Sequence, residues 1–87
     1  MKLALDWDGT YDRDPDFWNA FIDLAKRYGH EVTIVTKRGL SNQTLVSLPG
    51  TSVIHTDRAA KLKFVEDRGQ HFDIWIDDSP GNLFVDG

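Results

Sequence analysis

The stretch Leu3–Asp12, LALDWDGTYD, joins a short apolar run to two acids that lie one residue apart. The run Lys2–Asp6 is apolar at consecutive positions, which is typical of a strand covered on both faces. Two carboxylates this close repel each other, and proteins usually separate them unless a cation or a reaction needs both. The stretch therefore predicts a buried strand that ends in a functional turn.

Three further short runs share the strand pattern, and helical patterns alternate with them. The runs are rich in β-branched, aromatic and apolar residues, and they are Glu31–Thr36, Thr51–Thr56 and Asp73–Asp77. Strands that alternate with helices are typical of a parallel sheet in an α/β fold. The sequence therefore predicts an α/β domain with about four parallel strands.

Helix signals fall in each interval between the strands. Asp14 and Pro15 form a helix start, and an apolar stripe follows until Gly29, through Phe17, Phe21, Leu24, Ala25 and Tyr28. Ser41 favours a short helix through Leu48, before Pro49 and Gly50. Asp57 favours a third helix through Arg68, with Leu62 and Val65 on its apolar face.

Composition limits the classes of function. The 87 residues are enough for one small domain, spanning residues 1–87. The net charge of −4 provides no global positive field for long nucleic acid or anionic lipid. The chain has no cysteine, and its first apolar run is too short for a signal sequence or a membrane span. We expect a cytoplasmic protein without a membrane partner.

The polar residues at the strand ends predict a cation site. Asp6, Thr36, Thr56 and Asp77 each close a predicted strand, and the ends of parallel strands meet at one edge of the sheet. The pairs Asp6/Asp8 and Asp77/Asp78 would gather negative charge there, which Mg²⁺ could hold ionised. The alternative is that Asp8-Gly9 and Asp77-Asp78-Ser79-Pro80-Gly81 are ordinary turns.

Four motifs in order resemble those of the haloacid dehalogenase superfamily, most of whose members are Mg²⁺-dependent phosphatases. Asp6–Thr10, DWDGT, resembles the DxDGT signature that follows a hydrophobic strand. Thr36 resembles the second motif, Lys61 the lysine of the third, and Asp77-Asp78 with Asn82 the DDxxxN form of the fourth. The resemblance implies a three-layer α/β/α Rossmann-like fold and covers nearly the whole chain.

The resemblance also implies a role for each motif residue. Asp6 would be the nucleophile that forms an aspartyl-phosphate, and Asp8 would be the general acid and base. Thr36 and Lys61 would bind the transferring phosphoryl group. Mg²⁺ would contact the Asp6 carboxylate, the Asp8 main-chain carbonyl and a carboxylate of Asp77 or Asp78, of which we favour Asp78. The sequence leaves Lys63 open as a rival to Lys61.

Spacing bears on the substrate. Relatives select small substrates with a cap domain, and the intervals between Asp6, Thr36 and Lys61 are too short for one. The resemblance then implies an open site for a phosphoprotein or a nucleic-acid end; a nucleotide stays open, because Asp77–Pro80 resembles the fourth motif of deoxyribonucleotidases. Lys37-Arg38-Gly39 could contact a second phosphate, or could be a solvated basic loop.

Two other functions stay open at this stage. The chain could be a phosphate- or nucleotide-binding regulatory module without turnover, although an intact Asp8 favours an enzyme. It could also be a receiver-like phosphoacceptor, which keeps its phosphoryl group. So small a sheet could also rely on a second copy of the chain, because its edge strands need covering.

Overall fold

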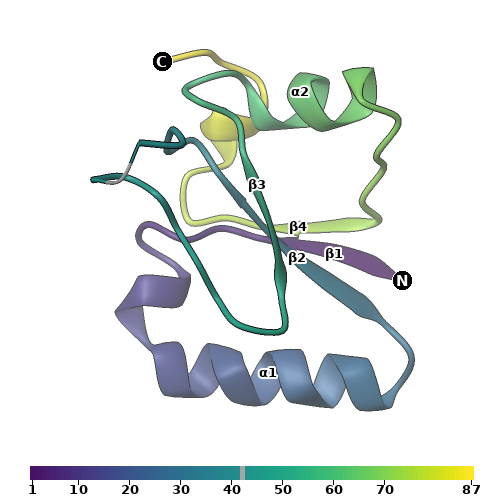
Figure 1. The fold of residues 1–87 in the computed structure, drawn as a ribbon. Coiled ribbons are helices and arrows are strands. Elements are labelled where there is room, and N and C mark those ends of the chain that lie inside the picture. Colours follow the sequence, from purple (N-terminus) through teal and green to yellow (C-terminus); the bar gives the residue numbers. More distant parts are fainter. Residues whose placement is uncertain (42) are drawn as a thin grey trace.

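The structure is a computed structural model that describes residues 1–41 and 43–87, and its core is a parallel sheet (Figure 1). The strands lie in the order β3-β2-β1-β4. Their bounds are Lys2–Leu5 for β1, Glu31–Thr36 for β2, Ser52–His55 for β3 and Ile74–Ile76 for β4. Each strand lies within its predicted run, so the α/β class and the four parallel strands are confirmed.

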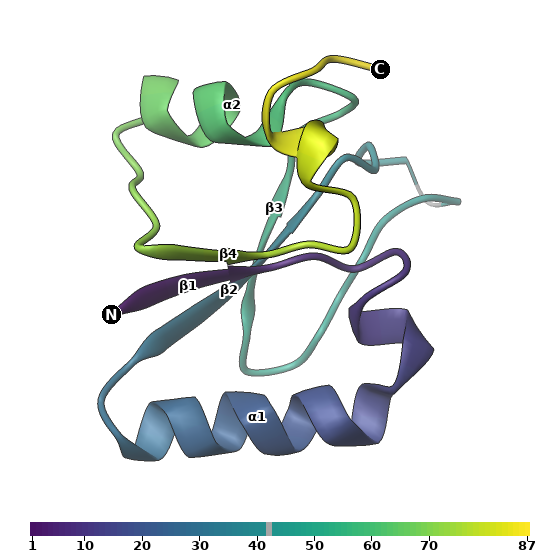
Figure 2. The same ribbon diagram turned by 180° about the vertical axis from the view of Figure 1, so that it is seen from behind.

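The sheet is covered on both faces. Leu3 and Leu5 of β1 join the apolar cluster beneath α1 (Pro15–Arg27), whereas Ala4 joins the cluster beneath α2 (Lys61–Asp67). This alternation follows from the two-residue period of a strand. Figures 1 and 2 show α1 and α2 on opposite sides of the sheet. The register sets Leu5 opposite both Ile34 and Ile76, so β1 and β4 end at the same level, and β2 continues two residues further, to Thr36, at the same edge.

The helix α1 forms as predicted, but its buried face includes only Phe21 and Ala25 of the predicted stripe. The Asp14 side chain caps it by accepting from the Phe17 N–H. Ile22 and Ala25 are buried, with Trp18 and Phe21 packed beside them. Three predicted stripe residues are about half or more exposed, namely Phe17, Leu24 and Tyr28. Neither α1 nor any other helix of the described residues is long and apolar enough to cross a membrane.

The short helix predicted from Ser41 to Leu48 is wrong for the described residues of that span, which make a turn at 43–44 and then run irregularly. Leu45 N–H donates to the Ser41 carbonyl, as one helical turn would require. The Val46 N–H instead donates to His55 Nε2 at 3.0 Å. Val46 is buried in the cluster beneath α1, so its burial and the histidine replace the helical ladder.

The helix α2 begins at Lys61, four residues after the predicted start at Asp57. Asp57 and Arg58 have φ angles of 52° and 70°, which a right-handed helix excludes. The Asp86 carboxylate accepts from the Ala60 N–H at 2.7 Å, directly before the helix. A short 3-10 helix, η2 (Pro80–Leu83), brings the chain back toward α2 and this contact.

Candidate functional site

The turn after β1 sets Asp6 and Asp8 at the carboxyl edge of the sheet, where the strands end. The Asp6 N–H continues the ladder by donating to the Ile76 carbonyl at 2.9 Å. The Asp12 carboxylate then accepts from the Gly9 N–H at 2.7 Å and closes the turn. Gly9 has a φ of 81°, and a Cβ there would lie 2.3 Å from Asp78 Oδ2. Glycine is therefore needed for both the turn and the close approach of Asp78.

Three carboxylates and one ammonium meet at this edge. Lys61 Nζ, at the start of α2, donates to Asp6 Oδ1 at 2.7 Å and to Asp77 Oδ2 at 2.6 Å. The three side chains are 1%, 6% and 3% exposed, respectively. Asp78 lies beside them, and one oxygen from each of Asp6, Asp77 and Asp78 lies within 4.8 Å of the others. We call these three aspartates the acidic cluster.

Thr10 connects two members of the acidic cluster, a role that the sequence did not indicate. Its buried hydroxyl lies 3.2 Å from Asp6 Oδ2 and 3.2 Å from Asp78 Oδ1, and it accepts from the Asp78 N–H. Since a hydroxyl has one proton, it donates to one carboxylate at a time. Thr10 follows Asp6 by four residues, but the chain between them is a turn, so no helical or strand periodicity predicts that the two side chains meet.

The surroundings of Asp6 oppose its ionisation. Burial raises the pKa of Asp6 from its ordinary value of 3.8 to about 6, against the opposing effect of the Lys61 ammonium. The neighbouring carboxyls of Asp78 and Asp77 are smaller contributors to the same rise in pKa. Because a lysine alone does not offset burial and two acidic neighbours, the cluster has a deficit of positive charge.

The cluster fits a hard divalent cation. Three carboxylates and one ammonium leave two negative charges, which is the charge that one Mg²⁺ would balance. Carboxylate oxygens are also the ligands that Mg²⁺ prefers. Asp77 is occupied by Lys61 and by the Ser79 N–H, whereas Asp78 is exposed and has a hydroxyl as its side-chain partner. Asp78 is therefore the more available of the two.

Asp8 and Thr36 lie at the carboxyl edge but outside the acidic cluster. The Asp8 carboxylate is half exposed and pairs with Arg38, which donates from Nε and Nη2 at 2.6–3.2 Å. The Thr36 side chain is buried, and its hydroxyl accepts from the Arg38 N–H at 3.2 Å. The Arg38 pairing was not predicted, because the sequence left this residue open between a phosphate contact and a solvated loop.

The two candidate lysines of α2 differ completely in setting. Lys61 is buried among carboxylates, as described above. Lys63 is exposed and pairs with Asp67 one helical turn away. Of the two, only Lys61 can act at the carboxyl edge.

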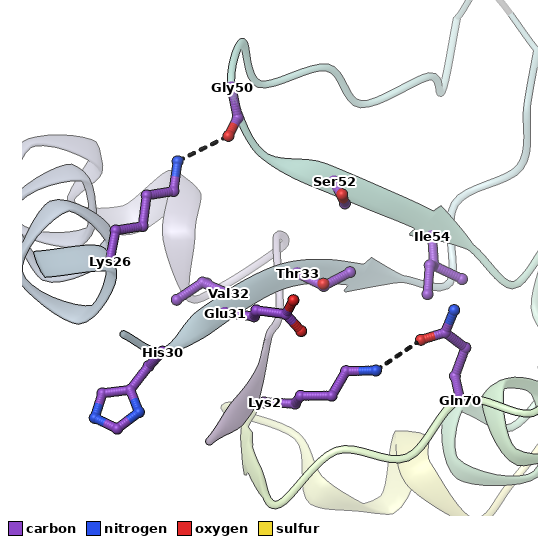
Figure 3. A pocket seen from close by; sticks show the side chains of 10 residues that line it. All are labelled: Lys2, Lys26, His30, Glu31, Val32, Thr33, Gly50, Ser52, Ile54 and Gln70. Atoms are coloured by element: carbon purple, nitrogen blue, oxygen red, sulfur yellow. Dashed lines mark hydrogen bonds between the residues drawn. The ribbon is translucent and has the colours of Figure 1, made fainter. Parts of the chain in front are cut away.

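A different hollow, of about 470 Å³, lies at the opposite edge, where the strands begin. Figure 3 shows Lys2, Lys26, His30 and Glu31 among the residues around it. Lys26 Nζ donates to the Gly50 carbonyl at 2.8 Å, and Lys2 Nζ to Gln70 Oε1 at 3.2 Å (Figure 3). The acceptors of both lysines are neutral.

Comparison with protein-family models, with curated proteins and with solved structures finds no match for this chain. Any interpretation of function therefore rests on the residues of this chain. The features that bear on it are the buried Lys61, the raised pKa of Asp6 and the acidic cluster.

Proposed function

We propose that this protein is a Mg²⁺-dependent phosphatase of the haloacid dehalogenase type, which hydrolyses a phosphomonoester through an aspartyl-phosphate on Asp6. The observation that carries the proposal is the setting of Asp6, in contact with buried Lys61 and Thr10 and within an acidic cluster. Helices on both faces of a parallel sheet also suit the three-layer fold of that superfamily. Perturbed carboxylates beside a buried cation are typical of active sites.

Mg²⁺ would be held by carboxylate oxygens of Asp6 and Asp78 and, as in the superfamily, by the Asp8 main-chain carbonyl. Asp77 would orient Lys61, because the two are already paired at 2.6 Å. When bound, Mg²⁺ supplies positive charge that offsets the phosphate oxygens and keeps Asp6 ionised. The close contact of Gly9 with Asp78 supports a role for that glycine in shaping the site.

The chemistry divides into two displacements at phosphorus. In the first, an Asp6 carboxylate oxygen forms a bond to phosphorus while the bond to the leaving oxygen breaks and Asp8 gives that oxygen its proton. In the second, Asp8 takes a proton from water, whose oxygen attacks phosphorus and breaks the bond to Asp6. Inorganic phosphate and the alcohol are released, and both aspartates regain their starting states.

Thr36 and Lys61 would bind the phosphoryl oxygens during both displacements. The Thr36 hydroxyl accepts from the Arg38 N–H, which leaves its own proton available to a phosphate oxygen. Lys61 would bring an ammonium that is already fixed by Asp6 and Asp77. Fixed donors need no reorganisation as charge moves in the transition state.

The substrate would approach an open edge. Between β1 and β2 the described chain forms only the turn, η1 (Tyr11–Arg13) and α1, and the described residues between β2 and β3 form a loop. None of these segments makes a cap domain. An open edge favours a phosphate that projects from a larger molecule or a nucleotide.

The test is phosphate release from an aryl phosphate and from nucleoside monophosphates, with Mg²⁺ or with EDTA. We expect turnover in Mg²⁺ that EDTA removes and that Asp6→Asn and Asp8→Asn each reduce by at least a thousandfold. Asp23→Asn is the matched control, because Asp23 is an exposed carboxylate on α1. It should leave turnover unchanged.

Two other outcomes would each point to a different function. Folded protein that binds Mg²⁺ and phosphate without turnover would indicate a binding module. A phosphorylated Asp6 that persists for hours would indicate a receiver-like phosphoacceptor.

A further inference from the structure

The loops that follow β2 and β3 enclose a second hollow, of about 400 Å³, at the carboxyl edge. Its charged residues are three cations, Lys37, Arg38 and Arg58, and one acid, Asp57. The hydroxyl groups of Ser41 and Thr44 also line it. In a chain with a net charge of −4, this local excess of positive charge departs from the rest of the molecule. We call this site the basic hollow.

Main-chain contacts hold the two loops of the basic hollow together. The Arg58 N–H donates to the Lys37 carbonyl at 2.8 Å, which ties the two loops together. Asp57 and Arg58 both have positive φ angles, a conformation that costs free energy in residues other than glycine. A Cβ at Gly39 would lie 2.8 Å from Asp57 Oδ1, so the loops are in close contact. Such strain is often found at functional sites.

Arg38 belongs to both the basic hollow and the candidate active site. Its guanidinium pairs with Asp8, the proposed acid and base, while its chain lines the hollow. The two partners are 36% and 51% exposed, so water and salt screen the pair, and a phosphate, which can accept the same two parallel guanidinium bonds, could compete with Asp8. The Arg58 side chain has no hydrogen-bond or ion-pair partner within residues 1–41 and 43–87. The hollow therefore contains donors that protein groups leave available.

We propose that the basic hollow binds a second phosphate group of the substrate, an inference that rests on the proposed phosphatase function. The scissile phosphate would occupy Thr36, Lys61 and the acidic cluster. Another anion would then meet Arg58, together with Arg38 and with Lys37, whose Nζ also donates to the Val85 carbonyl. Guanidinium groups with neighbouring hydroxyls match the oxygens of a phosphate. The substrate class is a phosphomonoester that carries a further phosphate, either a free bisphosphate or the phosphodiester beside a nucleic-acid end.

The first experiment compares kcat/KM in excess Mg²⁺ for adenosine 5′-monophosphate, adenosine 3′,5′-bisphosphate and a 5′-phosphorylated dinucleotide. One well-placed charged contact changes affinity by about tenfold, so the wild type should prefer the bisphosphate by that factor. Arg58→Gln should bring the ratio of the two kcat/KM values near one. Arg27→Gln removes an equal charge from the end of α1 and should leave the ratio unchanged.

The dinucleotide distinguishes the two sources of the second phosphate. A preference for it equal to that for the bisphosphate would assign the basic hollow to nucleic-acid ends, and a preference for the bisphosphate alone would assign it to a free bisphosphate. Equal kcat/KM for all three compounds in the wild type would overturn the subsite and leave the phosphatase intact. An unchanged ratio in Arg58→Gln would also overturn it.

A binding measurement separates failure of the subsite from failure of the proposed function. Calorimetric titration of Asp6→Asn with adenosine 3′,5′-bisphosphate should give a Kd about tenfold below that for the monophosphate. Adding Arg58→Gln to Asp6→Asn should remove the difference. If the wild type released no phosphate, this difference would still support the subsite. Equal binding of both nucleotides, or binding of neither, would overturn it.

Discussion

At the amino edge of the sheet, Lys2 and Lys26 donate to neutral oxygens around an open hollow (Figure 3). At the carboxyl edge, by contrast, Lys61 lies buried between two carboxylates. The hollow at the amino edge is large, at about 470 Å³. Burying charges is costly unless they are paired and hydrogen-bonded, as Lys61 is with Asp6 and Asp77. The buried, paired charges therefore make the carboxyl edge the candidate site, whereas the volume of the other hollow does not by itself indicate one.

The largest expected effect is that of removing the buried cation. Lys61→Met should lower the free energy of unfolding by about 3–5 kcal/mol, because Asp6 and Asp77 would stay buried without a neighbouring cation. Denaturant titration measures this loss. Lys61→Met combined with Asp6→Asn and Asp77→Asn should recover much of the stability.

The matched control for Lys61→Met is Lys63→Met, two residues along the same helix. Lys63 is exposed and pairs with Asp67, so its loss should change stability little. If Lys61→Met were as mild as Lys63→Met, the contrast between buried and exposed charge would fail.

A pair of glycines tests the contact between the turn and the acidic cluster. Gly9 and Gly29 have φ angles of 81° and 83°, so alanine at either position should cost about 1 kcal/mol in backbone strain. Only at Gly9 would the new Cβ meet Asp78, at 2.3 Å, whereas Gly29 has no atom within 4 Å. Gly9→Ala should therefore also weaken Mg²⁺ binding, measured by calorimetry. Equal Mg²⁺ affinity in Gly9→Ala and Gly29→Ala would argue against Asp78 as a ligand of the cation.

The raised pKa of Asp6 predicts how stability depends on pH without a divalent cation. Between its ordinary pKa of 3.8 and its folded pKa of about 6, the folded chain binds more protons than the unfolded chain. Stability should therefore fall as pH rises through this window. Asn at position 6 does not titrate, so Asp6→Asn lacks this loss. The difference in free energy of unfolding between Asp6→Asn and the wild type should therefore increase with pH over the same range. Mg²⁺ favours the ionised carboxylate and should reduce the pH dependence of this difference in free energy. A pH dependence that Mg²⁺ left unchanged would argue against a cation at Asp6.

The strands and their polar ends could be predicted, because burial on two faces leaves a local pattern in the sequence. Asp6 and Asp77 follow their strands directly, and parallel strands end at a shared edge. The elements that failed depend on distant partners. The start of α2 depends on Asp86, which is 26 residues from Ala60, and Val46 donates to His55 rather than to a helical carbonyl. No local pattern contains such contacts.

The same reasoning explains which contacts at the site were not predicted. Thr10 contacts Asp78 across 68 positions of sequence, and Arg38 reaches Asp8 across 30. Both contacts depend on how two loops face each other after the sheet has formed. Strand periodicity predicts which residues reach the edge, but the turns decide which of them meet.

The smallest expected effect is at the amino edge, and it decides between the two edges most directly. Lys26→Met removes a cation from the hollow of Figure 3 and breaks one exposed contact to the Gly50 carbonyl. Since surface changes of this kind alter stability by about 0.5 kcal/mol or less, the variant should remain folded. Phosphate release should equal that of the wild type, because no group of the proposed reaction lies at that edge. A loss of turnover in stable Lys26→Met would move the active site to the hollow at the amino edge and would make the buried charges around Lys61 a structural feature.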